Sequence, residues 1–219
     1  MTIVQQVAVL FFGLYYILGL SFYLFCLLGP FNFYLIPVLF IYSVYNSFDK
    51  APFSGSRKSI YHQKLLDRLF LMDHFSAYFP FKIIQDHEWN QSDPVIFACH
   101  PHGILSYSWL EIFATSVSNF AQLFPNIDVR LCTLNLQFAL PFLREPFLSR
   151  GLISANRATI TNCLLKRKSV AIVVGGAKES KFCEPGRHIL VLKHRKGFIK
   201  LALETGCGIV PVYSFGGIF

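Results

Sequence analysis

The distribution of apolar and polar residues separates the first 48 positions from the rest of the chain. Residues 1–48 contain no Asp, Glu, Lys or Arg. Within them Val7–Leu28 is an uninterrupted uncharged run that would form a helix roughly 33 Å long, enough to cross the ~30 Å hydrocarbon layer of a bilayer. The turn signal Gly29-Pro30 separates it from a second apolar run, Phe33–Phe48. The pattern predicts a transmembrane or membrane-embedded helical hairpin over residues 1–48.

A cleaved signal peptide is the alternative interpretation of this apolar start. It fits less well because no basic residue precedes the run, the run is longer than a signal sequence needs, and no small-residue cleavage site follows it. Lys50, Arg57 and Lys58 come directly after the second run. The positive-inside rule therefore places residue 49 onward on the cytosolic side.

Residues 49–93 form a second segment, with a helical period of apolar residues between Ile60 and Phe79. Charged residues such as Lys64 and Asp67 lie between the apolar ones. This period is typical of an amphipathic helix lying on the bilayer surface, and equally of one packed on a protein core. The segment is predicted to be interfacial.

From residue 94 onward, short apolar bursts alternate with helical stretches. The predicted strands are Pro94–Cys99, Val129–Leu134, Gly151–Ala155, Ser169–Val174, Ile189–Leu192 and Gly208–Ser214, and the clearest helices are Ile104–Phe120, Arg157–Arg167 and Gly197–Thr205. This alternation predicts an α/β sandwich with a largely buried, partly parallel sheet. Residues 94–219 are therefore interpreted as one globular domain.

The composition restricts the class of protein further. The chain has 219 residues, is 53% hydrophobic, and carries 20 Lys and Arg against 12 Asp and Glu, for a net charge of +8. These values exclude a disordered chain and a rod. Its six cysteines are scattered, which argues against a disulfide scaffold and predicts reduced thiols. The basic residues lack the interleaved aromatics of a nucleic-acid surface.

The tetrapeptide His100-Pro101-His102-Gly103 is the strongest candidate for chemistry, because it stands where a predicted strand ends and a helical pattern begins. A neutral imidazole there could take a proton while helix amides stabilise an oxyanion. The alternatives are a turn whose histidines bind backbone carbonyls, or a metal site that also uses Cys99. No further His or Cys cluster completes such a site, so no metal is predicted.

Two later stretches also place candidate binding residues at the end of a predicted strand or the start of a predicted helix. Gly175-Gly176 ends a predicted strand, and Glu179 follows it, placed to orient an imidazole or to pair with a cation. Arg195 and Lys196 stand at the start of a helical stretch. Such cations could hold the phosphates of a coenzyme or contact an anionic membrane, although a merely solvated surface has the same composition.

Taken together, these strings resemble the diacylglycerol acyltransferase type-two family, which includes monoacylglycerol and wax-alcohol acyltransferases. The matching stretches are Tyr78–Pro80, His100–Gly103, Phe124–Ile127, Pro141–Glu145, Val173–Ser180, Arg195–Phe198 and Val210–Gly216. They occur in the family's order from about Tyr78 to Gly216, and their combination is highly specific.

The resemblance implies transfer of a fatty acyl group from acyl-CoA to the hydroxyl of a neutral lipid, with diacylglycerol expected first and monoacylglycerol or a fatty alcohol as alternatives. It implies acyl-CoA as co-substrate, no bound cofactor, and a place in the endoplasmic reticulum membrane or on lipid droplets, with the globular part cytosolic. A homo-oligomer, or association with a full-length relative, is also compatible with it.

Transferred residue by residue, the family's active-site motif falls on His100, Pro101, His102 and Gly103. We expect His102 to be the base, with His100 supporting it or exchanging the role. Related glycerolipid acyltransferases carry an Asp four residues after the catalytic His, where this chain has Ser106.

An orienting carboxylate must therefore come from elsewhere, and Glu145 and Glu179 are the candidates. Arg195 and Lys196, with Gly175 and Gly176, are the predicted coenzyme-binding residues.

The resemblance ends at Ser214-Phe215-Gly216, which the family continues with Glu-Asn and a further stretch of domain, whereas here Gly217-Ile218-Phe219 follows. The acyltransferase domain is thus expected to be incomplete. The alternative function is an inactive isoform that binds neutral lipid or modulates a full-length relative.

Overall fold

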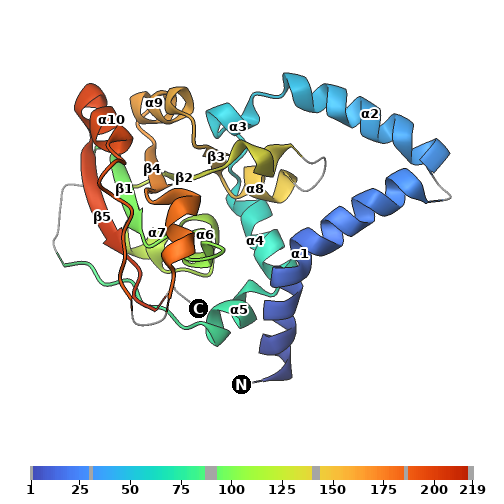
Figure 1. Ribbon diagram of the computed structural model, residues 1–219, viewed down its shortest axis with the longest axis horizontal. Helices are drawn as coiled ribbons and strands as arrows, with labels where there is room; N and C mark the ends of the chain where they lie inside the picture. Colours follow the sequence, from blue (N-terminus) through green and yellow to red (C-terminus); the bar gives the residue numbers. More distant parts are fainter. Residues whose placement is uncertain (1, 30–31, 87–92, 140–143, 185–186, 217–219) are drawn as a thin grey trace.

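A parallel β-sheet organises the part of the chain that follows residue 94. The computed structural model describes residues 2–29, 32–86, 93–139, 144–184 and 187–216 (Figure 1). Its strands are β1 (Val95–His100), β2 (Val129–Thr133), β3 (Leu152–Ser154), β4 (Ser169–Val173) and β5 (Gly208–Tyr213). They pair in the order β3-β2-β4-β1-β5, each parallel to its neighbours.

Helices precede, connect and cover these strands. They are α1 (Ile3–Leu28), α2 (Asn32–Phe48), α3 (Ala51–Ser54), α4 (Ile60–Leu69), α5 (Met72–Tyr78), α6 (Tyr107–Ala114), α7 (Phe120–Leu123), α8 (Glu145–Ser149), α9 (Arg157–Leu165) and α10 (Gly197–Thr205). Two 3₁₀ helices, η1 (Asn135–Phe138) and η2 (Gly176–Phe182), complete the described elements. Residues 140–143 and 217–219, which include part of the Pro141–Glu145 motif, lie outside the described ranges.

Both faces of the sheet are covered, which explains the continuous apolar character of the strands. β1 is buried along its whole length. Its Phe97 packs with Trp109, Phe113 and Phe120 of α6 and α7, while its Ile96 belongs to a second core that includes residues of α9 and α10. Because side chains alternate between the two faces of a strand, one apolar run supplies both cores. The predicted α/β sandwich is confirmed.

The strand predictions hold within one or two residues, with one exception. Ile189–Leu192 was expected to be a strand but has no regular secondary structure. The β1 edge is already paired with β5. The backbone N–H of Val191 donates instead to the Glu179 carboxylate at 2.7 Å. The Glu179 side chain thus accepts the Val191 N–H, which in a sheet would donate to the carbonyl of a neighbouring strand.

Two long predicted helices are each divided in the structure. The helix expected over Ile104–Phe120 begins only at Tyr107, because Ser106 adopts a left-handed backbone conformation with φ 56°, and it ends at Ala114. The helical period over Ile60–Phe79 is likewise split into α4 and α5 at Leu71, where φ is 53°. Leu71 thus separates two helices, whereas Ser106 delays the start of α6 and Thr115, in an extended conformation, ends it.

The first two helices follow the predicted apolar runs closely and form a V beside the globular part (Figure 1). One side of α1 packs on protein, since Ala8 is fully buried in a cluster with Met72 and Phe75 of α5. Within the described ranges, neither of these helices nor any later one combines the length and apolarity required to cross a membrane. The predicted transmembrane character of residues 1–48 is therefore not supported, whereas the pair of helices is present.

Helix α4 turns its polar side toward the protein. Gln63 and Asp67 are buried, whereas Tyr61, Leu65 and Leu69 are exposed. The alternative of an ordinary amphipathic helix packed on the core therefore does not hold for α4, whereas α5 buries Met72 and Phe75 in a hydrophobic cluster. The buried side of α4 is polar because Asp67 forms an ion pair with Arg150 and accepts hydrogen bonds from Ser116.

A buried carboxyl group in α6 makes the stability of this fold depend on pH. Glu111 is 3% exposed, and one of its carboxyl oxygens has no hydrogen-bond partner among the described residues. Burial raises its pKa from an ordinary 4.5 to about 7, while a hydrogen bond with Ser76 opposes the shift. Between these values the folded state binds more protons than the unfolded state, so the free energy of unfolding falls as pH rises.

We predict that Glu111→Gln removes this pH dependence and stabilises the protein at pH 8 by roughly 3 kcal/mol, the free-energy equivalent of the pKa shift. Denaturant unfolding at pH 5 and pH 8 measures it, with Glu204→Gln as the exposed control. An equal loss of stability between the two pH values in wild type and Glu111→Gln would refute the assignment.

Candidate active site

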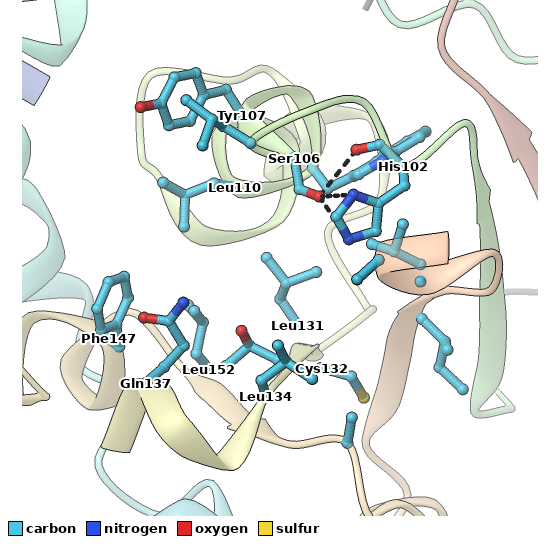
Figure 2. Close-up of a pocket in the computed structure, with 18 of the residues that line it drawn as sticks. His102, Ser106, Tyr107, Leu110, Leu131, Cys132, Leu134, Gln137, Phe147 and Leu152 are labelled. Atoms are coloured by element: carbon cyan, nitrogen blue, oxygen red, sulfur yellow. Dashed lines mark hydrogen bonds between the residues drawn. The ribbon is translucent and has the colours of Figure 1, made fainter. Parts of the chain in front are cut away.

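A cavity of about 400 Å³ lies at the carboxyl ends of the central strands, beside the histidine motif. Its walls come from β2, β4, α8 and the segment that joins β1 to α6, and they are largely apolar. Figure 2 shows His102 and Ser106 on one side and Leu131, Leu134 and Leu152 on another. Ligands of parallel α/β sheets bind at this end of the strands. The location predicted from the sequence is therefore the one the fold provides.

His102 is the histidine of the motif that lines the cavity. Its Nδ1 lies 2.8 Å from the carbonyl oxygen of Gly103. A carbonyl only accepts, so Nδ1 carries the proton and donates it to this bond. The lone pair is then on Nε2, and the tautomer is that of a base acting through Nε2.

Ser106 holds the same imidazole from the side (Figure 2). Its Oγ lies 3.1 Å from His102 Nδ1 and 3.3 Å from Nε2, and it donates to the His102 carbonyl at 2.9 Å. With its hydrogen used there, the hydroxyl oxygen can share the Nδ1–H with Gly103. The position four residues after His102 therefore contacts the imidazole although it carries no carboxylate.

Glu179 is the centre of the polar network behind His102. It is fully buried, and its Oε1 accepts the backbone N–H of His102 at 2.7 Å. Its two oxygens also lie 3.3 and 3.4 Å from Nδ1 of His100. Of the two predicted carboxylates, Glu179 is thus the one the fold brings to the motif. It contacts the His100 ring and the His102 backbone, not the His102 ring.

His100 is buried at the end of β1 and is not part of the cavity lining. Its place beside Glu179 suits a supporting role and not an exchange of roles with His102. Trp109 steadies the same turn, because its Nε1–H donates to the Pro101 carbonyl at 2.9 Å.

The glycine pair and Arg195 form one corner of the site. Gly176 and Arg195 line the cavity, and Arg195 Nη2 donates to the Gly175 carbonyl at 3.1 Å. A Cβ on Gly175 would lie 2.1 Å from Glu179 Oε2 and 2.6 Å from Glu179 Cβ. Gly175 therefore permits the close approach of the Glu179 side chain.

Two predicted site residues lie elsewhere. Glu145 pairs with Arg57 at 3.0 Å, accepts a hydrogen bond from Tyr42, and does not line the cavity. The prediction that it orients an imidazole is therefore not supported, because α8 turns it toward α2. Lys196 precedes α10 on the exposed surface, outside the cavity lining.

The metal-site alternative finds no support in the position of Cys99. Its thiol is fully buried in the sheet core and donates to the Phe97 carbonyl at 3.5 Å. Burial raises the pKa of this thiol well above its ordinary value, so it stays protonated. Among the residues described here, no group of three His, Cys, Asp or Glu side chains is placed to hold a metal ion.

Sequence reasoning missed the far walls of the cavity. Leu131–Thr133 of β2, Phe147 of α8 and Arg150 all line it. The β2 residues follow from the sheet order, which places β2 next to β4. Arg150 carried no signal in the sequence because a single cation between apolar runs is also typical of a solvated loop.

Comparisons with known proteins agree with the motif analysis. The chain matches the family described as diacylglycerol acyltransferase over residues 27–218. It is 37% identical to human acyl-CoA wax alcohol acyltransferase 2, covering 82% of this chain and 54% of that relative. It is also 38% identical to diacylglycerol O-acyltransferase 2B of Umbelopsis ramanniana, covering 82% and 51%, and to diacylglycerol O-acyltransferase 2 of Dictyostelium discoideum, covering 87% and 59%.

No solved structure matches this chain. The chain spans about half the length of the curated relatives it matches. The family match nevertheless covers most of its residues, including the histidine motif, the glycine pair and Arg195. On this evidence the chain belongs to the diacylglycerol acyltransferase family.

Proposed function

We propose that this protein transfers a fatty acyl group from acyl-CoA to the hydroxyl of diacylglycerol, forming triacylglycerol. The observation that carries the proposal is the 2.8 Å contact between His102 Nδ1 and the Gly103 carbonyl, which assigns the proton to Nδ1 and leaves Nε2 to act as a base beside an apolar cavity. The relatives from Umbelopsis ramanniana and Dictyostelium discoideum described above are named diacylglycerol O-acyltransferases. A relative named wax alcohol acyltransferase makes a fatty alcohol the second candidate acceptor.

The reaction needs one base and no covalent enzyme intermediate, because a thioester is already activated. Nε2 of His102 takes the hydroxyl proton as the acceptor oxygen forms its bond to the thioester carbonyl carbon. The tetrahedral intermediate collapses as the carbon–sulfur bond breaks, and Nε2 returns the proton to the departing thiolate. The Gly103 carbonyl, which accepts from Nδ1, stabilises the imidazolium between the two steps.

Glu179 acts in this proposal as a positioning residue. Its bond to the His102 backbone N–H and its approach to the His100 ring fix the turn that carries the base. Its remaining bond, from the Val191 N–H, ties the segment before α10 to the same carboxylate. The base, the glycine corner and Arg195 are thereby held in one arrangement.

Acyl-CoA is the proposed co-substrate, and no resident cofactor is assigned. Arg195 is the cavity-lining cation of the predicted coenzyme group. It is placed to contact a coenzyme phosphate from beside the Gly175-Gly176 turn. Lys196, exposed next to it, contributes charge outside the cavity.

We also propose that the protein works at the endoplasmic reticulum membrane or the lipid-droplet surface with its globular part in the cytosol. The outward side of α4 supports membrane contact, since Tyr61, Leu65 and Leu69 are 84%, 55% and 63% exposed. Large apolar residues exposed on one side of a helix are typical of interfacial attachment. Association with a second copy or with a longer relative is a further part of this proposal.

Replacement of the base tests the reaction. Expressed in membranes that lack neutral-lipid synthesis and supplied with labelled oleoyl-CoA and dioleoylglycerol, wild type is expected to form triacylglycerol. His102→Ala should lower the rate at least about 100-fold, the usual contribution of a general base. His74→Ala, which changes an exposed histidine of α5, should leave the rate unchanged. No product from wild type would end the proposal, and full activity of His102→Ala would remove His102 as the base.

The positioning role of Glu179 is tested through Gly175. Gly175→Ala is expected to cost about 1–3 kcal/mol of unfolding free energy and to lower activity, because the new Cβ meets a carboxylate and a Cβ that cannot both move away. The control is Gly197→Ala in α10, where a new Cβ meets nothing within 4 Å. Chemical denaturation and product formation are measured together. Equal effects of the two substitutions would contradict the crowding at Gly175.

Membrane contact by α4 is tested with two neighbouring positions. In a background without native cysteines, Leu65→Cys and Lys64→Cys are labelled with an environment-sensitive fluorophore and mixed with phosphatidylcholine and phosphatidylserine vesicles. The emission at position 65 should shift to the blue and that at position 64 should change little, because the helix turns only Leu65 toward the acyl chains. The same response at both positions would exclude this orientation.

A further inference from the structure

The cavity wall contains a buried cation that the proposed reaction does not use. Arg150 directly follows α8, is 4% exposed, and lines the cavity that contains His102. Burying a guanidinium is costly unless its charge and its N–H groups find partners. An N–H group of Arg150 that has no acceptor in the described part of the protein therefore indicates a hydrogen bond that a ligand could supply.

One half of the guanidinium is fully occupied by protein. Nη1 forms an ion pair with Asp67 and donates to the Ala114 carbonyl at 3.2 Å. The other oxygen of Asp67 accepts from the backbone N–H and the hydroxyl of Ser116, at 2.6 and 2.7 Å. The charge of Arg150 is therefore neutralised, and Asp67 is itself well supplied with donors.

In the part of the chain that the structure describes, nothing accepts a hydrogen bond from Nη2 of the same guanidinium. Nη2 also has almost no accessible surface, so a ligand oxygen reaches it only when the side chain turns toward the cavity that Arg150 lines. The guanidinium carbon also lies 5.9 Å from the centre of the Phe70 ring, and Phe70 lines the same cavity. The guanidinium is thus held between Asp67 and the Phe70 ring, and its Nη2 can still donate a hydrogen bond. A buried donor of this kind is costly unless a ligand oxygen completes it.

We propose that Arg150 donates through Nη2 to an ester carbonyl oxygen of the acyl acceptor and so selects acylglycerols over acceptors that lack an ester. The inference rests on the proposed function, since it places the acceptor in the cavity beside His102. Because Asp67 already balances the charge of Arg150, the free donor suits a neutral carbonyl better than a phosphate, which the carboxylate would repel. Arg195, whose Nη2 donates to the neutral Gly175 carbonyl, remains the cation for the coenzyme.

The surroundings of Arg150 agree with this class of ligand. Leu110, Phe147 and Leu152 give the cavity the apolar walls that an acyl chain requires (Figure 2). A fatty alcohol brings a chain and a hydroxyl but no second oxygen, so it would leave Nη2 without an acceptor. A site built around a hydrogen bond discriminates strongly against an analogue that cannot make it.

The first test compares two acceptors in the wild-type protein, one with ester carbonyls and one without. Wild-type protein comprising residues 1–219 is given labelled oleoyl-CoA with either dioleoylglycerol or its di-ether analogue, which has the same hydroxyl and chains but no ester carbonyl. We expect the ester to be acylated about 10- to 100-fold faster, the loss typical of a hydrogen bond to a charged group. Equal rates with the two acceptors would overturn the proposal.

Arg150→Lys then assigns the preference to the guanidinium. A lysine ammonium retains a positive charge for Asp67 but removes the second nitrogen of the fork. The ester-to-ether ratio should fall toward one, because only the ester loses a hydrogen bond. Arg157→Lys, at an exposed pair with Glu204, is the matched control and should keep the wild-type ratio. An unchanged ratio in Arg150→Lys contradicts the inference.

A double variant covers the case in which Arg150→Lys does not fold. Asp67→Asn with Arg150→Met removes both charges and leaves an amide oxygen for Ser116, and it too should lose the ester preference. Retention of the wild-type preference by this variant would overturn the assignment to Arg150.

A binding measurement tests the role of Arg150 independently of the proposed catalytic activity. If wild type acylates neither acceptor, the catalytic proposal fails, and the same ester and ether are compared as competitors of a photoactivatable diacylglycerol. Stronger competition by the ester in wild type, lost in Arg150→Lys, supports the binding role alone. Equal competition in wild type refutes it.

Discussion

The buried carboxylate of Glu179 is the contact on which the rest of the site depends. Three groups from two separate parts of the chain meet at its two oxygens: the His100 ring and the His102 backbone of one turn, and the Val191 backbone. A carboxylate with no exposed surface is stable only when such donors surround it. The turn after β1, the glycine turn after β4 and the segment before α10 are therefore fixed relative to one another, and His102 takes its place in the cavity as a consequence.

The parallel sheet gives this network its location. Because β1 and β4 are neighbours, the histidine motif after one and the glycine pair after the other meet at the same sheet edge. The sheet faces are closed by α6 and α7 on one side and by α9 and α10 on the other, so the strand ends are where a cavity can form. The apolar strands and helices that build the core also supply walls suited to lipid chains.

A second polar contact links the segment before the sheet to this cavity. Asp67 of α4 reaches Arg150 after α8, and the pair closes one wall near Phe70. This contact reverses the usual orientation of an amphipathic helix, since it draws the polar side of α4 inward and leaves Leu65 and Leu69 outside. The part of the protein proposed to meet the membrane and the part proposed to hold the acceptor are thus connected by one ion pair.

The sequence by itself determined the sandwich fold, all five strands, helices α9 and α10, and His102, Glu179, Gly176 and Arg195 as members of one site. Local periodicity specifies buried strands, and a motif at a strand end specifies the sheet edge. Only the tertiary structure placed Glu179 and not Glu145 beside the histidine motif, put His102 and not His100 on the cavity wall, and brought Arg150 to the same cavity. These outcomes depend on contacts such as Asp67–Arg150 and Glu179–His102, between residues more than seventy positions apart. Composition and spacing record which residues are present, whereas the packing of distant segments decides which of them meet.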